Sequence, residues 1–286
     1  NQVPDFMGYG NPYPSNSANG MYTVLDQNYS GIRISSQINN TLKPLESYNF
    51  NMGTDWEKID QARRLNENEF TVNKQLGFIS LNTSLNNDEI LAVAFEYTIG
   101  GQVYQVGEFS QNNIEEGGTL ILKLLKGSNL SPNQPTWDLM MKNVYNLGAY
   151  DLTQSDFDFQ VVYFNDSTNT YITNLPEGEL KDTILLRLMN LDNTNSQGDY
   201  AKNGDGMFDF IEGVTVYRKN GRIIFPVLEP FGANIANNLS SSDLQKKYAF
   251  TELYKQSKTD AEQLFQKNKF YMVGSYKGGS GSEIML

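Results

Sequence analysis

Short stretches in which apolar and polar residues alternate run through the middle of the chain and predict β-strands. The clearest pair is Glu89–Thr98 and Gln102–Phe109, which flank Gly100-Gly101. Glycine readily adopts the positive φ angles that a tight turn requires, so the two runs should form an antiparallel hairpin.

A second hairpin is predicted where Val214–Arg218 and Arg222–Val227 flank Asn220-Gly221. Asn-Gly between two apolar runs is among the strongest sequence signals for a hairpin turn. Pro226 has no amide hydrogen to donate, so the second strand should leave its sheet near that residue.

The same alternation predicts several more strands, the clearest of them at Phe157–Phe164. We expect the others at Leu76–Leu81, Thr119–Leu125, Trp137–Val144, Thr170–Asn174, Ile184–Asn190 and Lys269–Tyr276, with a strand-like patch at Gly31–Ile38. A helix is the alternative for Trp137–Val144, since Met and Lys both favour one.

Three capping boxes predict short helices. The boxes at 54–57, 242–245 and 259–262 indicate helices over Asp55–Asn66, from Ser242 to about Lys255, and from Thr259. Trp56, in the first of them, is expected to be a core anchor. The predicted fold class is therefore α+β and β-dominated, with antiparallel sheets, hairpins and about three short helices.

Changes in composition divide the chain into three predicted parts. Residues 1–45 are rich in Asn, Pro, Gly and Ser, which indicates an extended arm or, equally, a disordered leader. Residues 46–276 carry the predicted strands and helices and form one expected compact α+β module. Residues 277–286 contain Gly278, Gly279 and Gly281 and are expected to be a flexible exit linker.

Composition excludes several classes of function. The 286 residues include neither cysteine nor histidine, so disulfides, thiolate or imidazole metal sites and Ser-His-Asp triads are excluded. The formal net charge is −11 and the pI is near 4.6. Because such a chain repels phosphate, we expect no nucleic-acid partner and no electrostatic docking on an anionic membrane.

An acidic, glycine-rich loop gives the strongest hint of a metal site. Asn203, Asp205, Asp209 and Glu212 occupy the third, fifth, ninth and twelfth positions of the EF-hand spacing, with Gly206 at the sixth. The first position holds Ala201, so Asp199 or Asp192 would have to supply the missing ligand. The loop is therefore either a structural calcium site or an acidic turn that leads into the second hairpin.

One pair of carboxylates raises an enzymatic alternative. Glu96 and Glu108 stand among apolar neighbours in the first predicted hairpin. Two such groups can serve as acid and base across a glycosidic bond if they face one open cleft. The outward face of a half-buried strand explains both residues equally well, so we expect no catalytic residues.

Several long strings occur in a fixed order and carry a family resemblance. They are DEILAVAFEYTIGGQVYQVGEF (88–109), LILKLLKG (120–127), PTWDLMMKNVYNLGAY (135–150), LLRLMNLD (185–192), DGMFDFIEG (205–213), GRIIFPVLEPFG (221–232) and NKFYMVGSYKGGSGSEI (268–284). Together they resemble the SprA family, also called Sov, over roughly residues 46–286. Members of that family are very large outer-membrane proteins that form the translocon of the type IX secretion system and support gliding motility.

The resemblance implies that the chain is a soluble module of a giant outer-membrane β-barrel protein. It would be a non-enzymatic structural or docking module, in the extracellular space or the periplasm, whose partners are other secretion-system subunits and secreted cargo proteins. The resemblance brings no catalytic motif and no cofactor. The alternative from another class is a secreted binding module, stabilised by calcium, that recognises glycan or protein; exposed aromatic residues on one face would favour it.

Overall fold

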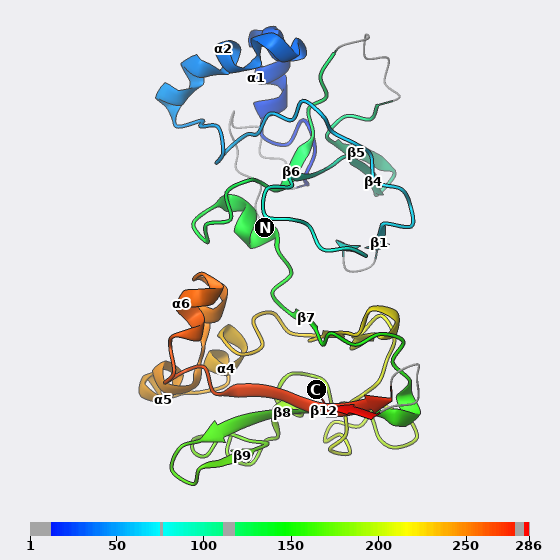
Figure 1. Ribbon diagram of the computed structural model, residues 1–286, viewed down its shortest axis with the longest axis vertical. Coiled ribbons are helices and arrows are strands. Elements are labelled where there is room, and N and C mark those ends of the chain that lie inside the picture. Colours follow the sequence, from blue (N-terminus) through cyan, green and yellow to red (C-terminus); the bar gives the residue numbers. More distant parts are fainter. Residues whose placement is uncertain (1–12, 75–76, 111–117, 278–282, 286) are drawn as a thin grey trace. The chain divides into compact units, whose positions relative to one another are not determined.

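The computed structural model describes residues 13–74, 77–110, 118–277 and 283–285 (Figure 1). The chain divides into two units, Asn1–Met140 and Met141–Leu286. This boundary lies within residues 46–276, which were expected to form one module. Apolar residues collect in separate clusters, one around Ile32, Leu42 and Leu45 and a larger one in unit 2.

Unit 1 begins with short helices where an extended arm was expected. The α-helices are α1 (Met21–Asn28) and α2 (Ile38–Leu42), and 3-10 turns occupy Ser30–Arg33, Ser35–Gln37, Lys43–Tyr48 and Pro135–Leu139. The expected strand at Gly31–Ile38 is therefore wrong. Ile32, Leu42 and Leu45 are buried together, because apolar side chains at these spacings meet when the segment coils and not when it is extended.

The strands of unit 1 form three separate antiparallel pairs. The bounds are β1 (Phe70–Asn73), β2 (Phe78–Leu81), β3 (Leu91–Val93), β4 (Phe95–Ile99), β5 (Gln102–Val106) and β6 (Lys123–Lys126), paired β1-β2, β3-β6 and β4-β5. The hairpin predicted around Gly100-Gly101 is confirmed, with Ile99 opposite Gln102. Both glycines have positive φ, at 59° and 83°.

The helix expected at Asp55–Asn66 is absent, and this prediction is wrong. The carboxylate of Asp55 accepts a hydrogen bond from the amide of Asn51, at 2.9 Å, instead of interacting with the first turn of a helix. Trp56 forms an isolated bridge with Met52 and packs against the cluster around Ile32. Its expected part as a core anchor is confirmed.

Unit 2 contains the larger core and two sheets. The four-stranded sheet has the order β13-β12-β8-β9, and the three-stranded sheet has the order β10-β11-β7. Their bounds are β7 (Val144–Asn146), β8 (Phe157–Asn165), β9 (Thr170–Ile172), β10 (Val216–Tyr217), β11 (Arg222–Ile224), β12 (Phe270–Lys277) and β13 (Glu283–Met285). All pairs are antiparallel, and β8 and β12 share the longest register, from Phe270 opposite Tyr163 to Tyr276 opposite Phe157.

Alternation along β8 explains which face of this sheet is buried. Phe157, Phe159, Val161 and Tyr163 point into the core, while the intervening residues form the outer face. The second predicted hairpin is also confirmed: Val216 pairs with Ile223 across a turn in which Gly221 has a φ of 56°. β11 ends at Ile224, two residues before Pro226.

Four short helices complete unit 2. They are α3 (Leu185–Leu188), α4 (Ala233–Asn237), α5 (Ser242–Tyr248) and α6 (Lys258–Glu262), with 3-10 turns at Gln154–Asp156, Arg218–Asn220 and Thr251–Tyr254. The N-caps of α5 and α6 are Ser241 and Ser257. α5 begins at Ser242, as predicted, but ends at Tyr248 and not near Lys255, and α6 begins at Lys258, one residue before the predicted Thr259. The described residues thus form six short α-helices, and the α+β, β-rich class is confirmed.

Two further strand predictions differ from the structure. Ile184–Asn190 contains helix α3 and no strand, since Leu185, Leu186 and Met189 are all buried, a spacing that fits one helical face. Trp137–Val144 is neither a strand nor an α-helix, because a 3-10 turn covers 135–139 and β7 begins at Val144.

The expected exit linker contains an ordered strand. Lys277 ends β12, and 283–285 form β13, which pairs with 275–277. Gly278, Gly279 and Gly281 lie outside the described residues. Within the part of the chain that the structure describes, no helix has the length and apolarity to cross a bilayer.

Candidate functional site

The acidic loop of unit 2 folds around a fully buried carboxylate, Asp192. This residue follows α3, which ends where Asn190 adopts a left-handed conformation with φ 56°. Asp192 Oδ1 accepts hydrogen bonds from the amides of Asp205, at 2.8 Å, and Gly206, at 3.2 Å. Asp192 Oδ2 pairs with the guanidinium of Arg187 at 3.0 Å. The two backbone amides and Arg187 therefore offset the free-energy cost of burying the charged carboxylate of Asp192.

The predicted calcium ligands are not all turned toward one point. Asp209 is buried, and its carboxylate accepts hydrogen bonds from the amide of Asn193 and the hydroxyl of Thr194. Asp205 Oδ1 accepts from the amide of Met207 at 3.0 Å, and Glu212 Oε2 accepts from the amide of Arg218 at 3.0 Å.

Asn203 is exposed in the same loop. Among the described residues, no group of three or more acidic side chains is arranged so that it could hold a metal ion. The calcium loop therefore stays a prediction from spacing, to which this geometry adds no support. The alternative interpretation, an acidic turn leading into the hairpin, agrees with the hydrogen bonds to backbone amides.

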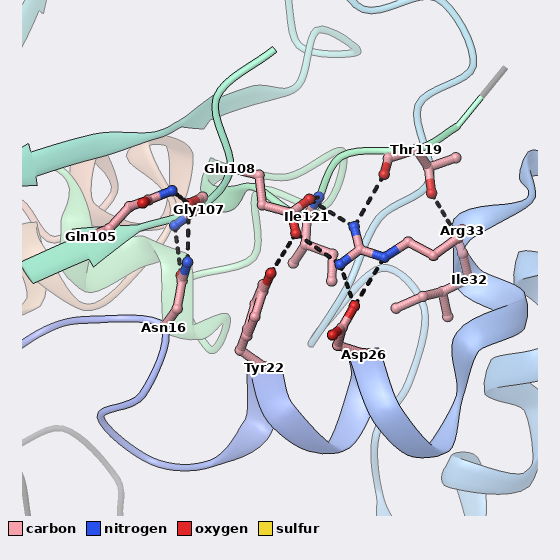
Figure 2. A network of polar contacts seen from close by, with 10 residues as sticks. All are labelled: Asn16, Tyr22, Asp26, Ile32, Arg33, Gln105, Gly107, Glu108, Thr119 and Ile121. Atoms are coloured by element: carbon pink, nitrogen blue, oxygen red, sulfur yellow. Dashed lines mark hydrogen bonds and ion pairs between the residues drawn. The ribbon is translucent and has the colours of Figure 1, made fainter. Parts of the chain in front are cut away.

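In unit 1, a polar network joins the N-terminal helices to the strand region (Figure 2). Arg33 donates to both carboxylate oxygens of Glu108, each at 2.8 Å, so the ion pair is bidentate. The same guanidinium pairs with Asp26 and donates to the carbonyl of Thr119 at 3.3 Å. Glu108 also accepts from the hydroxyl of Tyr22, at 2.6 Å.

The amide of Ile121 gives Glu108 its fourth hydrogen bond, at 2.8 Å. Burial raises the pKa of Glu108, but the hydrogen bonds from Arg33, Tyr22 and Ile121 outweigh it and hold that pKa below its ordinary value. The hydrogen bond to Glu108 raises the pKa of Arg33. Both groups therefore favour their charged forms, as in a structural ion pair.

Asn16 attaches the described start of the chain to the same region. Its backbone amide donates to the backbone carbonyl of Gln105 at 2.7 Å. Its side chain both donates to the carbonyl of Gly107, at 3.0 Å, and accepts from that residue's amide, at 2.8 Å. Together with the Arg33 network, these hydrogen bonds of Asn16 connect the first described residues to the end of hairpin β4-β5 (Figure 2).

The enzymatic alternative for Glu96 and Glu108 is weakened by these contacts. Glu96 is exposed on β4 opposite Gln105, whereas Glu108 is committed to Arg33. A carboxylate that is to act as a general acid needs a raised pKa, and that of Glu108 is lowered.

Sequence reasoning missed Arg33, Tyr22 and Asp26 as members of this network. No local motif marks them, because Arg33 and Glu108 are 75 positions apart.

The strings that carry the family resemblance supply much of the core of unit 2. The strings at 185–192, 205–213, 221–232 and 268–284 include the buried residues Leu185, Leu186, Met189, Leu191, Asp192, Asp209, Ile223, Ile224, Phe225, Phe231 and Tyr276. No protein-family model matches the chain, and no curated protein matches it at a significant level of similarity.

Proposed function

We propose that this chain is a non-catalytic structural and docking module of a SprA-like type IX secretion translocon. The resemblance of the seven strings, in one order, is the observation that carries the proposal. Five of these strings contribute buried residues of unit 2, Asp192 and Asp209 among them. Strings that combine buried apolar residues with buried, hydrogen-bonded carboxylates are what a family would share in order to keep one fold.

The polar groups of unit 1 fit the same function. Glu108 holds Arg33 through two hydrogen bonds, and a carboxylate with a lowered pKa is suited to fixing a scaffold and not to proton transfer. In the proposed function, the partners are other secretion-system subunits and secreted cargo. The segment would lie at the outer membrane, in the extracellular space or the periplasm.

The decisive experiment removes unit 2 from the parent protein in the bacterium that produces it. An in-frame deletion of 141–277 should abolish the release of type IX cargo, measured by mass spectrometry of the culture medium, and should stop colony spreading. Phe225→Asp, which places a charge in the core, should act like the deletion. Leu228→Asp, on an exposed residue of the same string, is the matched control and should export cargo normally. Normal export by the deletion strain would refute the proposal.

The location of the module can be tested separately. A protease-cleavable tag inserted at 278–281 of the intact protein should be cut on whole cells if this end faces the extracellular space. It should be cut only after the outer membrane is opened if this end faces the periplasm. A tag that is protected from protease under both conditions, in a protein that is present at normal abundance, would contradict an exposed docking module.

A further inference from the structure

The outer face of the four-stranded sheet in unit 2 carries a cluster of aromatic rings. Tyr171 lies on β9 and Tyr271 lies on β12, with β8 between them. Neighbouring strands are about 4.8 Å apart, so β9 and β12 are separated by roughly 10 Å. The two ring centroids are nevertheless only 5.2 Å apart. The rings must therefore lean toward each other over β8.

Residues of β8 complete this cluster. Phe164 is directly opposite Tyr171, and their ring centroids are 5.2 Å apart. Val162, directly opposite Tyr271, is only 7% exposed although it points to the outer face. The leaning rings account for the burial of Val162. They are not themselves buried by this contact, because Tyr171 and Tyr271 remain 57% and 42% exposed.

The remainder of the same face is polar except for Val273, which lies on β12 opposite Gln160. By alternation, Asp158 and Gln160 share the outer face of β8 with Val162, and Ser275 lies on β12 opposite Asp158. The outer face of an antiparallel sheet is ordinarily polar throughout when it meets water. Here aromatic rings at one end adjoin hydrogen-bonding groups at the other, an arrangement that suits a ligand with both an apolar surface and hydroxyl groups.

Charge restricts the class of ligand. Nucleic acids and sugars both stack on aromatic rings, but the chain has a net charge of −11 and would repel phosphate. Two lysines near this face are already paired, Lys269 with Asp166 and Lys277 with Asp156. Asp158 would accept hydrogen bonds from hydroxyl groups but would repel an anion. A neutral ligand is therefore favoured.

The size of the cluster argues against a large protein partner. Stable protein interfaces involve about 20 to 30 residues on each side. Three rings and three polar side chains match instead a short run of pyranose rings, whose C–H faces stack on tyrosine while their hydroxyls bond to Gln160 and Asp158. We propose that this face of the sheet, formed by Phe164, Tyr171, Tyr271, Gln160, Ser275 and Asp158, binds neutral glycan chains. This inference is independent of the secretion function proposed above.

Native gel electrophoresis of the full chain through gels that contain a soluble polysaccharide tests the proposal. The probes are a neutral β-glucan, a mannan, a xylan and hydroxyethyl cellulose, with alginate as the anionic probe. Migration should be retarded by at least one neutral polysaccharide and not by alginate. Tyr171→Ala and Tyr271→Ala should each weaken binding by roughly twofold to tenfold, the loss expected for one aromatic contact.

Two further variants keep the outcome clear if loss of a ring unfolds the sheet. Tyr171→Phe retains the ring and should retain most of the retardation. Gln160→Ala leaves the rings in place and should reduce it. Tyr200→Ala, at a tyrosine that is 79% exposed and outside this sheet, is the matched control and should bind like the unmodified chain. Absence of retardation by every neutral probe, or equal retardation of the Tyr171→Ala, Gln160→Ala and control variants, would overturn the proposal.

Discussion

Arg33 and Glu108 form a bidentate ion pair that joins the N-terminal helices of unit 1 to its strand region. Both hydrogen bonds measure 2.8 Å, and the side chain of Glu108 is the more buried of the two. Paired guanidinium and carboxylate groups of this geometry are among the stronger polar contacts in proteins. Removing either partner should be costly, because the remaining charge would be left without its counter-ion in a partly desolvated position.

Replacing Arg33 by Met should destabilise unit 1 by about 1.5–3 kcal/mol, which is the range for hydrogen bonds to charged groups. We expect a value toward the lower end of this range, because Arg33 is partly exposed. Urea denaturation followed by circular dichroism measures the change. Arg63→Met is the matched control: Arg63 also pairs with a glutamate, Glu69, but its side chain is largely exposed and its loss should change stability little. An equal effect of both substitutions would contradict the structural importance of the Arg33 pair.

The same pair predicts a dependence of stability on acid. Since the pKa of Glu108 lies below its ordinary value of 4.5 in the folded chain, the stabilisation is fully present above that value and is lost as the pH falls through the folded pKa. Melting temperatures of the unmodified chain and of Glu108→Gln should therefore differ at pH 7, and the difference should shrink as the pH falls from 4.5 through the folded pKa of Glu108. A difference in melting temperature between the two proteins that stays constant from pH 7 to pH 3 would show that ionised Glu108 is not the source of the stabilisation.

The turn requires glycine at position 221 because of its positive φ and because of a close backbone contact. Comparing Gly221→Ala with Gly213→Ala should separate these two effects. Its φ of 56° is unfavourable for a residue with a Cβ atom, and a Cβ at this position would collide with the backbone carbonyl of Ala149. Gly213, in the same unit, has a φ of 78° and open space around it. Gly213→Ala should cost about 1 kcal/mol, whereas Gly221→Ala should cost clearly more. Equal melting temperatures for the two variants would contradict the close approach of Gly221 to Ala149.

The two hairpins were predictable because their signals are local. Gly100-Gly101 and Asn220-Gly221 mark turns between alternating runs, and both turns lie between paired strands. β8 was predictable for the same reason. The capping box at 54–57 failed although its residues fit the pattern, because Asp55 bonds back to Asn51 and Trp56 is drawn into the core. Tertiary burial overrides a capping signal of about 1 kcal/mol.

The candidate sites were less predictable, since they depend on residues far apart in the sequence. Spacing identified the acidic loop, but it could not show that the amides of Asp205 and Gly206 turn toward Asp192. The ring contact of Tyr171 with Tyr271 spans 100 positions and depends on the strand order β12-β8-β9. No local pattern specifies strand order, and this accounts for what sequence reasoning missed.

The acidic loop gives a prediction about metal. Asp209 is buried and accepts hydrogen bonds from Asn193 and Thr194, so Asp209→Ala should lower stability by about 2–3 kcal/mol whether or not calcium is present. Asp205→Ala, at an exposed residue, should have a much smaller effect. Thermal melts with millimolar calcium and with a chelator should coincide. A higher melting temperature with calcium, lost in Asp205→Ala, would establish the loop as a calcium site.

A buried tyrosine, Tyr254, and its partly buried partner Tyr145 predict sensitivity to alkali. The hydroxyls of Tyr145 and Tyr254 are 3.1 Å apart, and Tyr254 also accepts from the amide of Phe231 at 3.0 Å. Burial raises the pKa of Tyr145 to about 12 and raises that of Tyr254 further.

Because the folded chain favours the protonated phenols, their contribution is fully present below the unfolded pKa of 10.0 and is lost as the pH rises above it. Unit 2 should therefore lose stability above pH 10, with late-titrating tyrosines detected by absorbance at 295 nm as the unit unfolds.

Tyr254→Phe isolates the contribution of the hydroxyl. It removes the acceptor of the Phe231 amide and the partner of Tyr145 while it keeps the ring that packs against Gly232. The loss should be about 1–3 kcal/mol at pH 7, because the buried amide of Phe231 is left without its partner. It should become smaller as the pH rises above 10, since the unmodified chain then loses the same contribution. Tyr150→Phe, at an exposed tyrosine, is the control and should melt like the unmodified chain at every pH. If Tyr254→Phe also melted like the unmodified chain at pH 7, the hydroxyl pair would have no stabilising effect.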